Sequence, residues 1–370
     1  MRILHVVTLI SPDGAYGGPA RVALNSCAEL IRRGHDVTIA AATRGQTSYP
    51  ALTEAVPSEL FASRMLLPTR TFHGMGAPGL TRWFAAHGAD YDVVHIHLGR
   101  DLVVLPIAMS ARRRKIPYVL QTHGMVTPAH ALSVPIDACW TRRALRDAGT
   151  VCYLTERERQ QLVAVGGAQL RLHELGNGVP EYPGRPRHLG RPEVLFAARL
   201  HRRKRPLAFV QMARLLLDSG VDARFTLVGP DGGEGSAVSA AIDGNRAICW
   251  EGPVAPDRLP ARLSAADIYV LPATMEPYPM SVLEAMSVGL PVVINEDCGL
   301  APAVYRAGCG IVTDGAPASI AAAVGKLLGD PALAMDMGHR GRRAARTEFA
   351  MPKIVDRLAQ IYDHARAGSS

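Results

Sequence analysis

The sequence has no uninterrupted apolar run of about 18 residues, the length that a membrane-spanning helix requires. Its opening stretch, MRILHVVTLI, is too short for a signal peptide and is followed at once by the turn-forming run SPDG. We interpret this stretch as a first strand that is buried on both faces of a sheet. These absences predict a cytoplasmic protein.

Cysteine is sparse and scattered. No two cysteines form a C-x-x-C pair, and none clusters with histidines at the spacing of zinc ligands. Isolated thiols of this kind are typical of buried residues in a reducing compartment. We also find no sequence repeat of short fixed period and no low-complexity tract. The six cysteines are Cys27, Cys139, Cys152, Cys249, Cys298 and Cys309.

Basic residues outnumber acidic ones, 41 to 33, which gives a net charge of +8. Two runs in the first half concentrate this excess, Arg112–Lys115 and Arg142–Arg146. A basic surface suits nucleic acid, anionic lipid or a phosphorylated substrate. No zinc finger, RNP motif or interleaved aromatic residue accompanies the runs, so we expect no nucleic acid partner. A solvated helix face is the simplest interpretation. Peripheral contact with the inner face of the plasma membrane, helped by Trp140 and Leu145, stays open.

Strands and helices alternate along the chain. The 370 residues, 48% of them hydrophobic, suit two domains better than one. Alternation with short glycine-rich turns is typical of a doubly wound parallel sheet. The strands expected in the first half are Ile3–Leu9, Val37–Ala42, Val93–Leu98, Tyr118–Gln121 and Val151–Leu154, and the helices are Pro19–Arg33, Leu102–Lys115, Trp140–Asp147 and Glu156–Val165.

The alternation stops at residues 181–192, EYPGRPRHLGRP, and then resumes. We therefore predict an N-terminal domain over 1–180, a linker over 181–192, a C-terminal domain over 193–350 and a final helix over 351–370 that crosses back to the first domain. Ligands of open parallel sheets bind beyond the strand C-termini, so we expect two Rossmann-like domains facing across a cleft. The strands expected in the second half are Val194–Ala198, Phe225–Val228, Ile268–Leu271 and Pro291–Ile294, and the helices are Pro206–Ser219, Leu259–Ala265, Val282–Ser287, Ala318–Leu328 and Met351–Ala367.

The most specific motif is EPYPMSVLEAMSVGLPVV, which begins at Glu276. Glu276 lies in a loop after a predicted strand, and Glu284 lies on the helix that follows. Pro279 precedes this helix, so we expect its first peptide N–H groups to be free to bind a phosphate. Carboxylates beside a bound phosphate suit sugar hydroxyls. An ordinary helix glutamate and a loop charge would explain the spacing alone, but not the whole motif. The N–H groups in question belong to Met280, Ser281 and Val282.

The motif resembles the signature of the retaining GT-B glycosyltransferases, the group 4 family that is also described as glycosyl transferases group 1. The resemblance covers nearly the whole chain, because weaker motifs occur in the family's order. They are Gly17-Gly18-Pro19, Arg33-Gly34-His35-Asp36-Val37, Asp92-Val93-Val94-His95, Thr122-His123-Gly124, Asn177-Gly178-Val179, Ala198-Arg199-Leu200 and Leu227-Val228-Gly229.

The resemblance implies roles for the charged residues. Glu276 would bind hydroxyls of the donor sugar, and Glu284 would bind those of the ribose. Arg199 and Lys204 would hold the diphosphate, whose growing charge fixed cations stabilise as it leaves. His123, after a predicted strand, would lie against the donor sugar.

The resemblance also implies backbone contacts to the donor. Gly17 and Gly18 would let the main chain approach the diphosphate closely, and Val254 would border the base. The family often has Gly-Phe-Gly after its first glutamate, where this chain has Pro277-Tyr278-Pro279. We therefore expect Tyr278 and Met280 to supply the backbone contacts, and the sugar hydroxyls that are recognised stay open.

Two rival patterns are weaker. Asp90-Tyr91-Asp92 matches the D-x-D metal motif of the other glycosyltransferase fold, but it precedes a strand and so lies at the wrong edge of a parallel sheet. His95 and His97 point to one face of a strand and could begin a metal site. No third ligand is evident near them in the sequence, so we expect packing instead.

The resemblance implies a retaining, metal-independent hexosyltransferase without a cofactor. The donor would be a UDP- or GDP-linked sugar, and the acceptor a sugar, a lipid-linked molecule or a small metabolite. The leaving phosphate would assist deprotonation of the acceptor, so the two glutamates are no glycosidase pair. Two alternatives stay open, a nucleotide-sugar epimerase of the same fold and a non-catalytic two-lobed sugar-binding protein. We see no lysine in the context of a pyridoxal-type phosphorylase.

Overall fold

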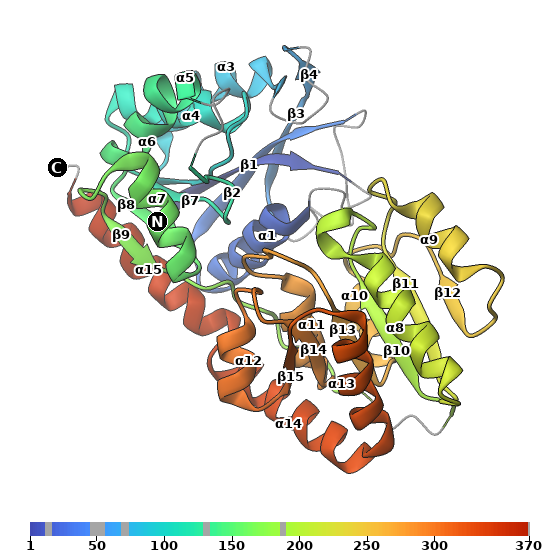
Figure 1. The fold of residues 1–370 in the computed structure, drawn as a ribbon. Helices are drawn as coiled ribbons and strands as arrows, with labels where there is room; N and C mark the ends of the chain where they lie inside the picture. Colours follow the sequence, from blue (N-terminus) through green and yellow to red (C-terminus); the bar gives the residue numbers. More distant parts are fainter. Residues whose placement is uncertain (12–16, 45–55, 68–73, 129–133, 186–189, 369–370) are drawn as a thin grey trace. The chain divides into compact units, whose positions relative to one another are not determined.

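The computed structural model describes residues 1–11, 17–44, 56–67, 74–128, 134–185 and 190–368. The chain divides into two compact units, shown in Figure 1. The first comprises Met1–Gly178 together with Met351–Ser370, and the second comprises Val179–Ala350.

The first unit contains a seven-stranded parallel sheet of order β3-β2-β1-β6-β7-β8-β9. A two-stranded antiparallel sheet, β4 with β5, accompanies it. The strands are β1 (Arg2–Ile10), β2 (Asp36–Thr43), β3 (Ser58–Ala62), β4 (Arg64–Met65), β5 (Met75–Gly76), β6 (Val93–His97), β7 (Tyr118–Gln121), β8 (Thr150–Tyr153) and β9 (Leu172–Glu174). The helices are α1 (Gly17–Arg32), α3 (Pro78–His87), η2 (Gly88–Asp90), α4 (Val104–Arg114), α5 (Val134–Ile136), η4 (Asp137–Thr141), α6 (Arg142–Asp147), α7 (Glu156–Gly166) and α15 (Met351–Ala367).

Helices cover both faces of this sheet, so its central strands are buried and mostly hydrophobic, with His5, His95 and His97 as buried exceptions. One face packs on α1 and α15, and the other packs on α3, α4, α6 and α7. Helix α15 presents apolar residues at helical spacing, among them Ile354, Leu358 and Ile361, and all three are buried in the first unit. The chain thus returns to this unit after residue 350.

The second unit is a six-stranded parallel sheet of order β12-β11-β10-β13-β14-β15. Helix α11 packs on α10 and α14, while α13 packs on α8. The strands are β10 (Glu193–Ala197), β11 (Arg224–Val228), β12 (Ile248–Trp250), β13 (Ile268–Leu271), β14 (Val292–Asn295) and β15 (Gly310–Thr313). The helices are η5 (Arg202–Lys204), α8 (Pro206–Asp218), α9 (Gly235–Ile242), α10 (Leu259–Ser264), α11 (Met280–Val288), α12 (Ala301–Ala307), α13 (Pro317–Gly329) and α14 (Pro331–Thr347). Two doubly wound parallel sheets confirm the expected fold class.

The stretch 181–192, expected as a linker, lies within the second unit. The backbone N–H of Arg185 donates to the carbonyl of Val288 (2.9 Å), and its guanidinium forms an ion pair with Asp267 (2.9 Å). These bonds tie the described residues 181–185 to the sheet and to α11. Residues 186–189 lie outside the described part of the chain.

Part of each basic run of the first unit is engaged in local contacts, whereas Arg113, Arg114, Lys115 and Arg143 are exposed. Arg112 forms an ion pair with Asp147, while Arg142 and Arg146 donate to backbone carbonyls at 3.0 and 2.8 Å. Leu145 is 0% exposed, so the expectation that it dips into a membrane is wrong. No single helix in the described ranges has the length and apolar character of a membrane span. Helices α13 and α14 have that length and character only when taken together, and the chain bends by 102° between them.

Candidate functional site

In the second unit the strand order reverses between β10 and β13. Strands β11 and β12 extend the sheet on one side of β10, and β13, β14 and β15 extend it on the other. Loops that leave neighbouring strands in opposite directions open a crevice at the carboxyl edge, where ligands of doubly wound sheets bind. Arg199 and Lys204 follow β10, and Glu276 follows β13. The switch point therefore carries three of the candidate residues.

Lys204 and Glu276 meet across this point. The Lys204 Nζ lies 2.7 Å from Glu276 Oε2, and the two side chains are 22% and 15% exposed. The neighbouring cations have other contacts: Arg203 donates to the carbonyl of Met275, and Arg205 donates to that of Gly315. Within the basic turn, Lys204 is thus the residue whose charge faces a candidate glutamate.

The loop that carries Glu276 is held in a strained conformation. Met275 has φ of 53°, a left-handed value that residues with a Cβ rarely adopt. Its N–H donates to Asp297 Oδ2 (3.0 Å), and its carbonyl accepts from Arg203 Nη2 (2.7 Å). The carbonyl of Glu276 accepts from the N–H of Gly299 (2.8 Å). Strain of this kind persists where surrounding bonds enforce it, and it concentrates at functional sites.

Helix α11 begins at Met280 with Pro279 as its N-cap, and no side chain caps it. The N–H of Val282 donates to the carbonyl of Pro279 (3.1 Å), so the expectation that this amide is free is wrong. The tight first turn uses the Val282 amide in this hydrogen bond, so the amides of Met280 and Ser281 remain as the candidate anion donors. The hydroxyl of Tyr269 donates to Ser281 Oγ (2.7 Å) and holds that side chain in place.

Glu284 lies one turn into α11 and is 0% exposed. Val282 and Leu283 of this helix are also buried, so an apolar residue at position 284 would satisfy the packing. A buried carboxylate is expensive unless a polar group meets it. The interpretation of Glu284 as an ordinary solvated helix glutamate therefore does not hold.

The remaining candidates of this unit lie at the same edge of the sheet. Arg199 runs past Gly232, where a Cβ would stand 2.7 Å from the Arg199 Cγ, so only glycine leaves the arginine its place. Val254 follows β12 and is partly buried, as is Tyr278 in the Glu276 loop. The structure thus brings Arg199, Lys204 and Glu276 to neighbouring loops and places Val254 after the edge strand.

In the first unit the order reverses between β1 and β6. Gly17 and Gly18 were expected in the loop after the first strand, but they form the first turn of α1. Among the described residues, a Cβ at Gly18 would meet nothing within 4 Å, so their packing does not require glycine there. Residues 12–16, which connect β1 to this helix, lie outside the described ranges.

His123 follows β7 in a turn that is also strained. Its φ is 50°, and that of Gly124 is 73°. The carboxylate of Glu158, 1% exposed, accepts from the Thr122 hydroxyl and from the Gly124 and Leu154 N–H groups. Sequence reasoning missed Glu158, because a first-turn helix glutamate carries no signal of burial. Burial lowers the pKa of His123 to about 3, so the imidazole is neutral at physiological pH.

The structure treats the two alternative metal motifs, Asp90-Tyr91-Asp92 and His95 with His97, differently. Asp92 precedes β6 and accepts from the backbone N–H of Arg2 (2.8 Å), at the amino edge of the sheet as expected. The sequence showed no third ligand near His95 and His97, but the fold brings one to them. His5 on β1 is paired with His95 in the sheet register, and ligand nitrogens of the three rings lie within 4.8 Å of one another.

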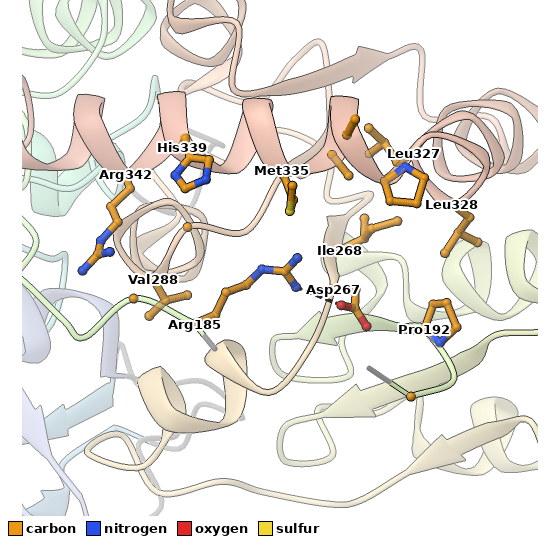
Figure 2. Close-up of a pocket in the computed structure, with 16 residues that line it drawn as sticks. Arg185, Pro192, Asp267, Ile268, Val288, Leu327, Leu328, Met335, His339 and Arg342 are labelled. Atoms are coloured by element: carbon orange, nitrogen blue, oxygen red, sulfur yellow. Dashed lines mark hydrogen bonds and ion pairs between the residues drawn. The ribbon is translucent and has the colours of Figure 1, made fainter. Parts of the chain in front are cut away.

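A cavity of about 750 Å³ lies elsewhere in the second unit (Figure 2). Its lining includes Pro192 and Asp267, which precede β10 and β13, together with Met335, His339 and Arg342 of α14. Figure 2 shows Arg185 reaching across to Asp267. The cavity is therefore at the amino edge of the sheet, away from the loops that carry Lys204 and Glu276.

Comparison with known families and proteins gives a consistent result. Residues 182–344 match the family model described as glycosyl transferases group 1, and residues 17–178 match the glycosyl transferase 4-like domain. The chain is 30% identical to a D-inositol 3-phosphate glycosyltransferase of Acidothermus cellulolyticus over 75% of this chain and 68% of that protein. It is 28% identical to a glycogen synthase of Mycobacterium tuberculosis over 100% of this chain and 96% of that protein.

Solved structures share the fold at lower identity. HepE of Anabaena, determined in complex with UDP and glucose, is similar with a TM-score of 0.78 and 18% identity, over 98% of this chain and 99% of that one. Sucrose-phosphate synthase of Thermosynechococcus elongatus is similar with a TM-score of 0.77 and 17% identity, over 100% of both chains.

Proposed function

The chain belongs to the glycosyl transferases group 1 family, with a GT-B fold, and from that premise we propose that this glycosyltransferase retains the anomeric configuration of its donor and needs no metal ion. The donor is a nucleoside diphosphate sugar, and the acceptor contributes a hydroxyl group.

One observation carries the proposal: Lys204, Glu276 and the start of α11 gather at the switch point of the second sheet. A departing nucleoside diphosphate gains negative charge, and a fixed cation beside free amide donors stabilises that charge. Arg199 supplies a second cation on the same loop. Two cations and a helix N-terminus take the place that a divalent metal has in other transferases.

The reaction then proceeds on one face of the donor sugar. The bond from the anomeric carbon to the phosphate oxygen breaks, and a bond from that carbon to the acceptor oxygen forms. The acceptor proton passes to the leaving phosphate, so no side chain acts as nucleophile. We assign Glu276 to the hydroxyls of the donor sugar, Glu284 to the ribose, and His123 to the sugar as a further catalytic residue.

The backbone groups have lesser roles in this proposal. The amides of Met280 and Ser281 bind the phosphate, Tyr278 contacts the sugar through its main chain, and Val254 borders the base. The Anabaena structures that contain UDP or UDP-glucose make UDP-glucose the first donor to test, with GDP-linked sugars next. The relatives are named for acceptors as different as inositol phosphate, glycogen and 2-deoxystreptamine, so the acceptor is sought in a panel of sugars, small metabolites and lipid-linked molecules.

Slow hydrolysis of the donor tests the proposal without knowledge of the acceptor. The protein is incubated with UDP-glucose, whose anomeric configuration is α, at a concentration high enough to release glucose faster than it mutarotates, and the first-formed anomer is observed by proton NMR. Retention predicts α-glucose, at the same rate with and without EDTA. First-formed β-glucose would contradict retention, and loss of activity in EDTA with recovery in magnesium or manganese would contradict metal independence.

A further inference from the structure

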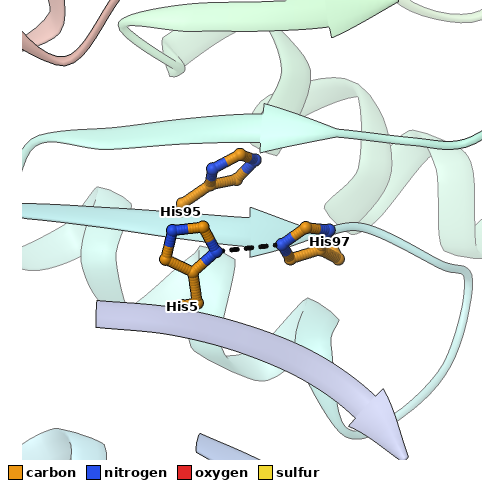
Figure 3. Close-up of side chains that lie close together, drawn as sticks. All are labelled: His5, His95 and His97. Carbon is orange, nitrogen blue, oxygen red and sulfur yellow. Dashed lines mark hydrogen bonds between the residues drawn. The ribbon is translucent and has the colours of Figure 1, made fainter. Parts of the chain in front are cut away.

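Three buried histidines, a buried tyrosine and the partly buried His123 form one continuous group in the first unit. His5 lies on β1, His95 and His97 lie on β6, and all three are at most 1% exposed (Figure 3). His123 follows β7, and Tyr362 of α15 lies on the face of the sheet that α1 and α15 cover. Five polar rings in a hydrophobic interior need a partner for each buried nitrogen and oxygen.

The rings meet most of this need by hydrogen bonding in a line, and among the described residues only His95 Nε2 of these rings is buried without a hydrogen-bond partner. His123 Nε2 lies 2.7 Å from His97 Nδ1, and His97 Nε2 lies 3.2 Å from His5 Nδ1. His5 Nε2 lies 3.0 Å from the hydroxyl of Tyr362, which lies 2.7 Å from His95 Nδ1. Three contacts thus connect His123 to Tyr362 of the C-terminal helix, and the fourth continues from Tyr362 to His95. We name this group the histidine line.

The proton count restricts the histidine line to two states when the Tyr362 hydroxyl donates to one of its two histidines and accepts from the other. Burial lowers the pKa of His5 to about 3 and lowers those of His95 and His97 well below the ordinary value, so each ring is neutral and has one N–H. Each contact needs one donor and one acceptor. If His123 donates from Nε2, every ring along the line is an Nε2–H tautomer. If His123 accepts at Nε2, every ring is an Nδ1–H tautomer.

The same rings are poorly arranged for a metal ion. The His95 and His97 rings are stacked, with centroids 4.6 Å apart and an angle of 7° between their planes. The lone pairs of an imidazole lie in the plane of the ring, so those of two stacked rings run parallel and do not converge on one ion. The nitrogens that face each other in the line are also committed to hydrogen bonds.

We propose that His97, His5 and Tyr362 are positioning residues which hold His123 in a single tautomer and orientation through the histidine line. A neutral histidine can present either N–H or a lone pair to a sugar hydroxyl, and only a fixed tautomer offers one of them consistently. On the other side of His123, Glu158 holds the turn that sets its backbone. The catalytic consequence rests on the proposed function, whereas the shared tautomer does not.

The shared tautomer is tested by NMR on the full chain. Selective 15N-labelling of histidine and long-range proton–nitrogen spectra report the tautomer of each ring, and single His variants assign the four signals. We expect all four rings to be the same tautomer. Tyr362→Phe keeps the aromatic ring but removes the hydroxyl, so we expect His123 to show averaged shifts of both tautomers.

Activity supplies the second readout. In Tyr362→Phe we expect kcat to fall about tenfold, equivalent to about 1.4 kcal/mol of transition-state free energy, with KM for the donor nearly unchanged. Tyr118→Phe is the matched control. It also removes a buried tyrosine hydroxyl of this unit, one that donates to the carbonyl of Ala144 (2.7 Å) outside the line. We expect it to leave both kcat and the tautomers unchanged.

Each of the alternative results would overturn one part of the proposal. Mixed tautomers in the native protein, unchanged His123 shifts in Tyr362→Phe, or a stoichiometric transition metal in the purified protein would overturn the histidine line. A shifted tautomer with full kcat in Tyr362→Phe, alongside a slow His123→Ala, would overturn its catalytic consequence. A fully active His123→Ala would instead count against the proposed role of His123, and the NMR spectra would still decide the tautomer.

Discussion

The ion pair between Lys204 and Glu276 allows the proposed function to be separated from a purely structural explanation. If the pair only stabilises the loop, removing both charges should restore what removing one disturbs. If each charge binds a different part of the donor, removing both should be at least as harmful as removing either. We therefore consider Lys204→Met, Glu276→Gln and the double variant.

The structure sets the expected magnitudes. The side chains are 22% and 15% exposed, so the pair lies between surface pairs and fully buried ones. Removing one partner should lower the free energy of unfolding by about 1–2 kcal/mol, between the values for exposed and buried pairs. The double variant should recover part of this loss, because it leaves no unpaired charge. The variants should stay folded, since domains are typically stable by about 5–15 kcal/mol.

Activity should respond differently from stability. Removing one group that stabilises transition-state charge typically costs about 10²–10³-fold in kcat. We expect both single variants to lose about this much, and the double variant to lose no less. The assay is donor hydrolysis at saturating UDP-glucose, together with urea unfolding of each variant.

Arg202→Met is the matched control, because Arg202 is an exposed cation in the same turn. Its kcat should stay within about twofold of the native value, as expected of a surface substitution. Recovery of the double variant to within about tenfold of native activity would refute the reasoning. It would show that the pair acts through loop stability rather than through contact with the donor.

Three further predictions concern other residues. Glu284→Gln should raise KM for the donor with a smaller effect on kcat, because ribose binding is equal in the ground and transition states; a change confined to kcat in steady-state kinetics would contradict this assignment. Gly18→Ala should leave the melting temperature unchanged or higher, since a Cβ there meets nothing within 4 Å among the described residues, yet should weaken donor binding measured by calorimetry; native affinity would remove Gly18 from the site. The protein should stay in the supernatant with anionic liposomes at physiological salt, because Leu145 is buried and Arg112, Arg142 and Arg146 have local partners; salt-sensitive sedimentation would restore the membrane contact.

The sequence alone determined the fold class and the kind of ligand. Buried parallel strands are short apolar runs, and helices carry apolar residues every three or four positions, so both are encoded within a few neighbours. Gly34 illustrates this local encoding: it follows the predicted helix Pro19–Arg33 directly, and its φ of 83° suits a glycine at the end of α1. Several elements were not predicted, among them the half-exposed edge strand β3, and helix α14, whose buried residues are all alanine or glycine.

The tertiary structure decided which distant residues meet. Nothing in the local pattern indicates that β10 neighbours β13, yet this adjacency brings Lys204 to Glu276. The N–H of Val282 donates to the carbonyl of Pro279 because the first turn of α11 is tight, and the residue types do not specify that tightness. His5, His97 and Tyr362 come from three elements far apart in the chain, and each alone is indistinguishable from a packed core residue. Their hydrogen bonds exist because strand order and the return of α15 place them together, and those are properties of the whole unit rather than of any segment.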